Sequence, residues 1–292
     1  MEPLRVGLVG AGPWAELAQV PMLEEHPDIR LVAGWARRPE AMARLVGSER
    51  TVSAYDELLD AVDAGVFCVP PDVQAELAPQ AAARGRHLFL EKPLAFDVRG
   101  AERVAEAARD VTSLVYLRTR FEPAMLELEA WCARAEPVAA TVTMVSGGAI
   151  PGEPFATPWR QERGALDDLG PHALDLLDAL LGPVEELTAT GDPRRWVAVT
   201  TRHRSGAVGQ AALSITTPLP RGVSRCEVYA GGEVREFDGY RDSEDTTTRR
   251  AVLDELVAAV RESRPARIDA ERGLLVQRLL DRAHTSLRRG DA

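Results

Sequence analysis

The stretch LDDLGPHALDLLDALLG, from Leu166 to Gly182, places ionisable side chains at helical spacing in an otherwise apolar run. Asp168, His172 and Asp175 are separated by four and three residues, so on a helix they share one face. Two interpretations fit this pattern. One is an amphipathic helix that turns a wet face to solvent, and the other is an acid/base site built on an imidazole and a carboxylate. The stretch by itself leaves both open.

A glycine motif follows the first apolar run of the chain. In VGLVGAGPWA, Gly10, Gly12 and Ala15 form a G-x-G-x-x-A pattern after a strand-like segment and at the start of a helical one. Glycines at such a turn let the backbone approach a pyrophosphate, whose charge meets the positive end of the helix, and Pro13 suits a first helical turn. A tight strand-to-helix turn is the alternative. The context favours dinucleotide binding.

The end of the second expected strand reads Trp35-Ala36-Arg37-Arg38. NAD-specific domains usually carry an acid there that binds the ribose hydroxyls, and here the acid is missing. Two guanidinium groups could instead hold a 2′-phosphate through charge-assisted contacts. The alternative is a pair of surface arginines at a helix start. The missing acid and the added arginines together favour NADP over NAD.

A fourth candidate lies where the fifth expected strand ends, in HLFLEKPLA. Glu91, Lys92 and Pro93 would lie at the carboxyl edge of the sheet, where open α/β folds bind ligands. Lys92 could donate a hydrogen bond to a substrate oxygen and stabilise negative charge on it. An ordinary surface turn is the alternative.

These residues need a scaffold, and the alternation of elements predicts one. The first 120 residues alternate β-rich apolar runs with helical stretches, which is typical of a parallel sheet wrapped by helices. The expected strands are LRVGLVG, IRLVAGWA, TVS, GVFCVP, HLFLE and TSLVYL, and the nearly continuous apolar character of the first places it centrally.

The remainder of the chain has a different texture. A helix (PAMLELEAWCARA), a strand (VAATVTMV) and a Gly/Pro-rich loop precede the 166–182 helix, and two strand pairs follow, turning at Ser205-Gly206 and Gly231-Gly232. A helical tract from about Thr247 to Arg288, broken at SRPARID, comes last. We therefore predict an α/β fold with a doubly wound dinucleotide-binding domain over residues 1–119. An α+β domain with an open, mainly antiparallel sheet would occupy residues 120–292, with a C-terminal helix able to pack back on the first domain.

Composition limits the classes of partner. A formal charge of -10 with interspersed signs argues against nucleic acid or an anionic membrane surface. The three scattered cysteines indicate neither a disulfide framework nor a metal site. The sequence enters an apolar strand almost at once, without the pattern of an export signal, so we expect a cytoplasmic protein.

With these motifs in place, the chain resembles the Gfo/Idh/MocA oxidoreductases, which include glucose–fructose oxidoreductase and inositol dehydrogenase. The resemblance rests on the GAGPWA turn, the block from DAGVFCVPP to HLFLEKPLA, the RFEP segment at Arg120 to Pro123, and the block TPWRQERGALDDLGPHALDLL. It implies a Rossmann domain joined to a C-terminal α/β domain, and a nicotinamide-dependent enzyme that acts on CH–OH groups of sugars, polyols or related compounds.

Carried over residue by residue, the resemblance implies that Lys92, His172 and Asp168 are catalytic, and it favours the acid/base interpretation of the helix. Asp175 would be a supporting or solvent-facing residue, and Arg118, Arg120 and Tyr240 are weaker site candidates. The implied cofactor-binding residues are Gly10, Ala11, Gly12, Pro13, Trp14, Ala36, Arg37, Arg38, Val69, Pro70, Pro71, Gln74, Glu91, Lys92, Arg118, Trp159 and Arg160.

The sequence also departs from the family pattern. Gln74 stands where a histidine is common, Arg163-Gly164 replaces part of a glycine run, and Pro171 precedes His172. The leading hypothesis is an NADP-dependent oxidoreductase that acts mainly as a ketone reductase on a sugar-like substrate. The alternatives are an enzyme that retains its cofactor and achieves net hydrolysis or epimerisation, and a non-catalytic nucleotide-binding sensor or scaffold. The open sheet favours a homo-oligomer.

Overall fold

The structure is a computed structural model that describes residues 2–243 and 245–290. The chain divides into two compact units. The first consists of Met1–Tyr116 with Arg249–Gln277, and the second of Leu117–Thr248 with Arg278–Ala292. In the described part of the chain, no helix has both the length and the apolar character that a membrane span requires.

The first unit is built on a parallel sheet with the strand order β2-β1-β3-β4-β5. Its strands are β1 (Leu4–Val9), β2 (Ile29–Trp35), β3 (Ala64–Phe67), β4 (His87–Leu90) and β5 (Ser113–Val115). Every residue of β3 is buried, which requires cover on both faces of the sheet. β1 lies between β2 and β3, so its predicted central place is confirmed.

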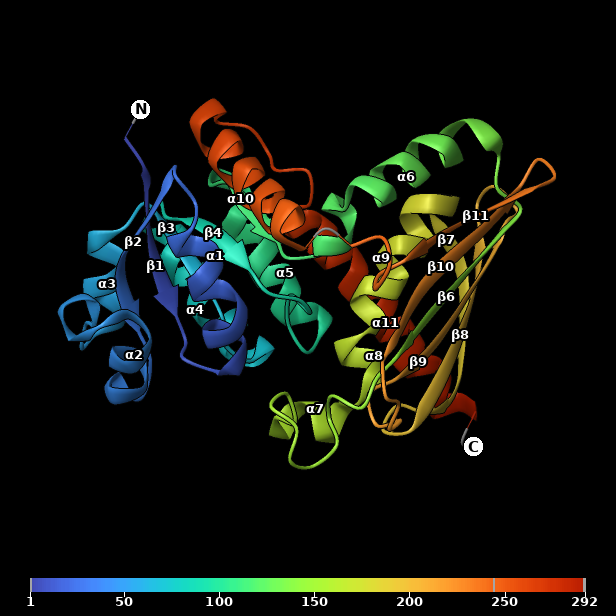
Figure 1. Cartoon of the computed structure of the whole chain (residues 1–292), viewed down its shortest axis with the longest axis horizontal. Helices are drawn as coiled ribbons and strands as arrows, with labels where there is room; N and C mark the ends of the chain where they lie inside the picture. Colours follow the sequence, from blue (N-terminus) through green and yellow to red (C-terminus); the bar gives the residue numbers. More distant parts are fainter. Residues whose placement is uncertain (1, 244, 291–292) are drawn as a thin grey trace. The chain divides into compact units, whose positions relative to one another are not determined.

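Helices connect the strands of this sheet (Figure 1). They are α1 (Val20–Glu24), α2 (Pro39–Val46), α3 (Tyr55–Ala61), α4 (Pro71–Ala83) and α5 (Val98–Ala107). Most of α10 (Asp245–Glu262) and the beginning of α11 (Ala270–Gly290) belong to this unit as well. The backbone N–H of Val115 donates to the carbonyl of Ile268 at 2.7 Å, and that of Ala270 donates to Oγ of Ser113 at 3.0 Å, so the late segment is fastened to β5.

One predicted strand is wrong. The TVS segment forms no strand, and only Thr51 makes an isolated bridge, to Gly34. Ser53 is engaged in starting a helix, because its backbone N–H and its hydroxyl both donate to the carboxylate of Glu57 at 3.1 Å. These local hydrogen bonds to the first turn of α3 compete with strand pairing and end the extended segment.

The second unit contains a six-stranded sheet with the order β11-β10-β6-β9-β8-β7. Its strands are β6 (Ala139–Val145), β7 (Val184–Asp192), β8 (Trp196–His203), β9 (Val208–Ser214), β10 (Val223–Ala230) and β11 (Glu233–Asp238). All neighbours are antiparallel except β6 and β9. The predicted pairs β8–β9 and β10–β11 are confirmed, as is the predicted fold class.

Helices cover one face of this sheet, and its other face carries no helix of the described chain (Figure 1). α9 (Gly170–Leu181) packs on β6 and β9, and α6 (Pro123–Ala135) packs on β10 and β11. α7 (Pro158–Arg163) and α8 (Ala165–Asp168) precede α9. Trp196, Val208 and Val223 are exposed hydrophobic side chains of the sheet. The homo-oligomer expected from the sequence stays a prediction.

Gly164 fixes the turn from α7 into α8. Its φ is +77°, and a Cβ built there would lie 2.1 Å from the carbonyl oxygen of Pro193. That same carbonyl accepts the backbone N–H of Ala165 at 2.7 Å. The absence of a side chain at Gly164 therefore lets α8 begin directly against the turn between β7 and β8.

Gly164→Ala should reduce the free energy of unfolding by roughly 1–3 kcal/mol more than Gly152→Ala, because only the first methyl group meets backbone atoms. Gly152 is a matched control, since its φ is +103° and no heavy atom lies within 4 Å of its added Cβ. Urea unfolding followed by tryptophan fluorescence measures both losses. Equal losses would show that the contact with Pro193 is not a constraint.

Candidate functional site

The glycine loop lies where β1 ends. Gly10 has a φ of +105°, and a Cβ there would lie 2.3 Å from the carbonyl oxygen of Cys68, so only glycine fits between the ends of β1 and β3. Its backbone N–H donates to the carbonyl of Trp35 at 2.8 Å. Gly12, by contrast, has no neighbour within 4 Å of an added Cβ. The loop is therefore packed tightly at its base and open at its tip, where a ligand could approach the backbone.

Three connections of the first sheet meet around this loop in a pocket of about 190 Å³. Residues from three of the predicted cofactor segments line it together with four neighbours. The lining residues are Gly10, Ala11, Gly12, Trp35, Ala36, Arg37, Arg38, Ala41, Cys68, Val69, Pro70 and Val73. The open tip of the loop and the two guanidinium groups thus fit a phosphorylated dinucleotide.

Arg37 and Arg38 are both exposed. Neither forms an ion pair with an acidic residue of the described chain. Arg38 is the residue that precedes α2, and Arg37 comes just before it. Their positive charge at this pocket is therefore not neutralised by a protein carboxylate.

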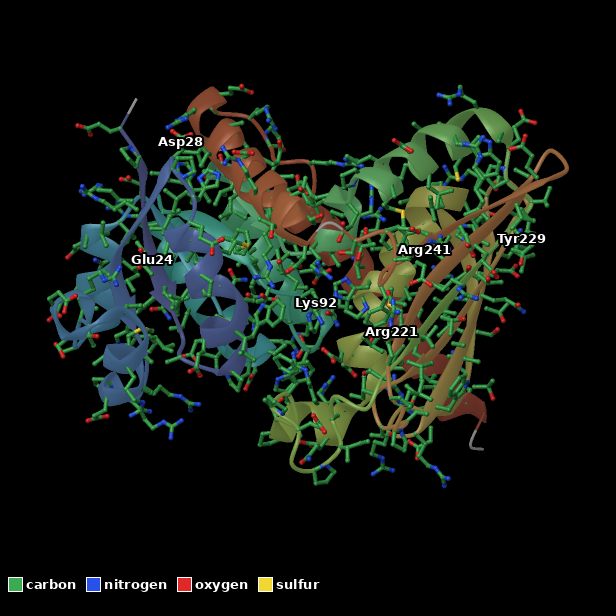
Figure 2. All side chains as sticks on the ribbon, viewed as in Figure 1. Glu24, Asp28, Lys92, Arg221, Tyr229 and Arg241 are labelled. Carbon is green, nitrogen blue, oxygen red and sulfur yellow. The ribbon has the colours of Figure 1, made fainter. Side chains whose placement is uncertain are left out.

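The Glu91–Lys92–Pro93 turn follows β4, and its backbone is held by a buried glutamine. Gln74 of α4 is fully buried. Its Oε1 accepts the backbone N–H of Glu91 at 2.8 Å, and its Nε2 donates to the carbonyls of Glu91 at 2.9 Å and Leu94 at 3.1 Å. Gln74 and the buried Pro71 do not line the pocket of the glycine loop. Gln74 therefore holds the backbone on both sides of Lys92, the residue that Figure 2 labels.

The carboxylate of Glu91 links this turn to the helix after the glycine loop. Nε1 of Trp14 donates to Oε1 of Glu91 at 2.7 Å, and Nε2 of Gln19 donates to the same oxygen at 2.9 Å. Burial raises the pKa of the Glu91 carboxyl, and the Lys92 ammonium and the two donors offset part of that rise. Pro13 opens the helix, which makes a π-helical turn at Ala15–Gln19. Glu91 thus joins its turn to the helix that follows the glycine loop.

In the second unit, the predicted catalytic stripe lies on a nearly continuous helix. The N–H of Leu169 donates to the carbonyl of Ala165 at 2.8 Å, and that of Ala173 donates to Leu169 at 3.1 Å, so α8 runs into α9 with helical hydrogen bonds. Asp168 and His172 keep their four-residue spacing, and both are half-buried. The helix does not turn a wet face to solvent, because all but two residues of α9 are buried.

Arg160 forms an ion pair with Asp168. Its Nε lies 3.1 Å from Oδ1 of Asp168, and its guanidinium stacks over the ring of Trp159 with 4.4 Å to the ring centroid. The predicted Trp159-Arg160 pair is therefore attached to the predicted catalytic carboxylate. The contact is a charge-assisted pair that fixes the position of this carboxylate oxygen.

Three further candidates take part in ion pairs of the second unit. Asp175, expected as a supporting or solvent-facing residue, is buried, and its Oδ1 lies 3.1 Å from Arg120 Nη1. Arg120 also pairs with Glu129 at 2.6 Å. Nη1 of Arg118 lies 2.8 Å from Oδ1 of Asp245. These arginines fasten segments of the second unit to one another.

The chain also contains a buried pair that the sequence did not single out. Asp167 is fully buried, its Oδ1 lies 3.2 Å from Arg163, and its Oδ2 lies 2.9 Å from Nε2 of His284 on α11. The only sequence signal is the doubled acid at 167–168, and the partner from α11 is more than a hundred residues away. Gln19 was also missed by sequence reasoning, because nothing in the sequence around a helical glutamine indicates that it bonds to Glu91.

The hydrogen bonds at the C-terminal end of α9 show which ends of the strands lie near His172. The carbonyls of Leu181 and Gly182, at the C-terminal end of α9, accept from Ser205 and His203, which lie at the turn between β8 and β9. The N-terminal half of α9, with His172, therefore points to the opposite edge. That edge carries the ends of β6 and β9 and the start of β10, and we call it the His172 rim.

Fold and pocket define a class, the two-part α/β proteins with a Rossmann-type dinucleotide-binding sheet. Residues 4–118 match the model of an oxidoreductase family with an NAD-binding Rossmann fold, and residues 136–232 match the Gfo/Idh/MocA C-terminal domain. The chain belongs to the Gfo/Idh/MocA family.

Relatives and solved structures agree with this membership. The chain is 31% identical over 199 residues to inositol 2-dehydrogenase of Rhizobium meliloti, which covers 64% of this chain and 58% of that protein. It is 36% identical over 110 residues to dTDP-3,4-didehydro-2,6-dideoxy-alpha-D-glucose 3-reductase of Streptomyces antibioticus, covering 36% and 34% of the two chains. The chain thus spans less than two thirds of the length of these curated relatives. The WlbA dehydrogenase of Bordetella pertussis, solved with NADH and UDP-GlcNAcA, shares the fold with a TM-score of 0.86 at 22% identity, covering 99% and 98%.

Gln74→Ala should speed amide hydrogen exchange at Glu91 and lower the free energy of unfolding by about 2–4 kcal/mol, because it removes the acceptor of a backbone N–H and leaves buried carbonyls without a donor. Exchange measured by mass spectrometry on the peptide spanning β4 and the turn reports the local effect. Gln80→Ala is the control, since Gln80 is exposed on the same helix and bonds only to Glu76. Unchanged protection in Gln74→Ala would contradict the assigned support.

Proposed function

We propose that this protein is an NADP-dependent oxidoreductase that transfers a hydride between the nicotinamide and a carbinol or ketone carbon of a sugar, polyol or related molecule. The observation that carries the proposal is the pocket in which the open tip of the glycine loop faces two arginines without carboxylate partners among the described residues. The first unit would bind the dinucleotide and the second the substrate. A bound nicotinamide supplies or accepts the hydride.

The tasks of the protein side chains follow from their chemistry. The His172 imidazole would take the hydroxyl proton of an alcohol substrate, or give a proton to the oxygen of a ketone. The Lys92 ammonium would donate a hydrogen bond to that oxygen and stabilise its negative charge. Asp168, with Oδ1 held by Arg160, would orient His172 and stabilise its protonated form.

The named relatives support the substrate class. One is an inositol dehydrogenase, one is a reductase of a dTDP-linked sugar, and one was solved with a UDP-linked sugar acid. Because cellular NADP pools are usually kept reduced, we propose ketone reduction as the working direction.

The cofactor preference can be tested on keto-sugars with NADPH and NADH. The wild type should prefer NADPH, and the Arg37→Ala/Arg38→Ala double variant should raise KM for NADPH by roughly 10–100-fold with little change for NADH, because charge-assisted contacts to the 2′-phosphate are lost. Arg44→Ala, an exposed arginine of α2 outside the pocket, is the control. Equal or better use of NADH by the wild type would refute the preference.

The role of His172 is tested by His172→Asn, which should lower kcat by about a hundredfold or more while NADPH binding and the urea midpoint stay as in the wild type. The asparagine keeps a polar side chain of similar size and removes the titratable ring. Steady-state kinetics and fluorescence titration with NADPH separate catalysis from binding. A variant with wild-type kcat would remove His172 from the mechanism.

A further inference from the structure

Arg221 stands out among the arginines near the His172 rim because it stacks on an aromatic ring while no carboxylate of the described chain pairs with it. It lies on the loop between β9 and β10 and is exposed (Figure 2). Its guanidinium stacks on the ring of Tyr240, with 4.6 Å from Cζ to the ring centroid. The neighbouring arginines are neutralised. Arg241 binds Asp242 at 2.6 Å and Glu236 at 2.7 Å, and Arg225 lies 3.6 Å from Asp238.

The stacked pair is built into the fold. A Cβ at position 222 would lie 2.2 Å from the hydroxyl oxygen of Tyr240 and 3.0 Å from the carbonyl oxygen of Val145, so the glycine leaves the space that the phenol end occupies. Arg221 therefore stacks on a ring whose phenol end lies against the backbone at Gly222. A guanidinium that is already stacked loses less conformational entropy when it binds an anion than a free one does.

The direction in which Tyr240 lies follows from the strand. Cys226, Val228 and Ala230 of β10 are buried under the helices, and alternate residues of a strand share a face. Gly222 lies four residues before Cys226, so by the same alternation its Cβ position is on the helix-covered face. The Tyr240 hydroxyl, which lies beside that position, is therefore on the same face. α9 packs on this face of the sheet. The Tyr240 hydroxyl and His172 are therefore on the same face and at the same edge, the His172 rim.

A planar cation at this place has a definite ligand chemistry. The guanidinium donates paired hydrogen bonds that match the two oxygens of a carboxylate or of a phosphate. A neutral polyol offers hydroxyl groups, which bind a charged donor less strongly. The recognised group would be a substituent of the substrate away from the reacting carbon.

We propose that Arg221, preorganised by Tyr240, binds an anionic group of the substrate, so that the preferred substrate is a sugar acid or a phosphorylated sugar and not a neutral one. This inference rests on the proposed function for the location of the substrate, but its test measures binding and needs no turnover.

The experiment uses isothermal titration of the full chain saturated with NADP⁺, with D-glucuronate, D-glucose 1-phosphate and D-glucose as probes. The wild type should bind at least one of the two anions about tenfold or more tightly than glucose. The anion that responds distinguishes a carboxylate from a phosphate substituent. Arg221→Gln should abolish this preference, and Arg221→Lys should keep part of it, because the charge remains and the stacked planar fork is lost.

Arg225→Gln is the matched control, since Arg225 lies on β10 in the alternation that faces away from the helices. It should leave all three affinities unchanged. Anion affinities of the wild type no higher than that for glucose, or an anion preference that survives Arg221→Gln, would overturn the proposal. Arg221-dependent anion binding without any hydride transfer would support the proposal and count against the proposed function instead.

Discussion

A half-buried carboxylate still needs hydrogen-bond donors, and the way Glu91 obtains them governs the candidate site of the first unit. Its donors come from Trp14 and Gln19, which follow the glycine loop, and its own backbone is held by Gln74. An unpaired carboxylate in the same place would cost several kcal/mol, so these elements are held in mutual position. The loop that would bind a pyrophosphate and the turn that carries Lys92 therefore form one hydrogen-bonded assembly.

The sequence predicted the parts of the fold that depend on local pattern. The apolar run of β1 and the two hairpins of the second unit carry strong signals of strand and turn, and the structure contains them. TVS failed because Ser53 bonds to Glu57 in the first turn of α3 and not to a neighbouring strand. Strand β7, VEELTATGD, is missing from the expected strands because only part of it is covered, where Ala189 bonds to Ser286 of α11. Its sequence therefore lacks the apolar alternation that would have predicted a strand.

In the candidate site, too, the sequence predicted the residues that belong to a local motif and missed the roles that depend on tertiary contacts. Motif spacing and the family resemblance predicted the glycine loop, Lys92, Asp168 and His172 as site residues, and the structure brings the loop and the Arg37-Arg38 pair to one pocket. The supporting residues are different. Gln74 and Asp167 interact with groups that only the tertiary fold brings near, and a single buried polar residue looks the same in sequence as an exposed one. The opening pattern of the 166–182 helix was ambiguous for this reason, since a buried, paired Asp175 and a solvated one have identical spacing.

Charge distribution explains how an acidic protein can still have anion sites. The formal charge of -10 acts through solvent, and at physiological ionic strength its influence decays over a Debye length of about 8 Å. A guanidinium in hydrogen-bond contact with a phosphate or carboxylate acts well inside that length. Most arginines here pair with acids and cancel locally, for example Arg120 with Asp175 and Arg264 with Glu255. The local balance around each arginine therefore matters more for anion binding than the net charge of the chain, and Arg37, Arg38 and Arg221 are among the arginines that no carboxylate of the described residues neutralises.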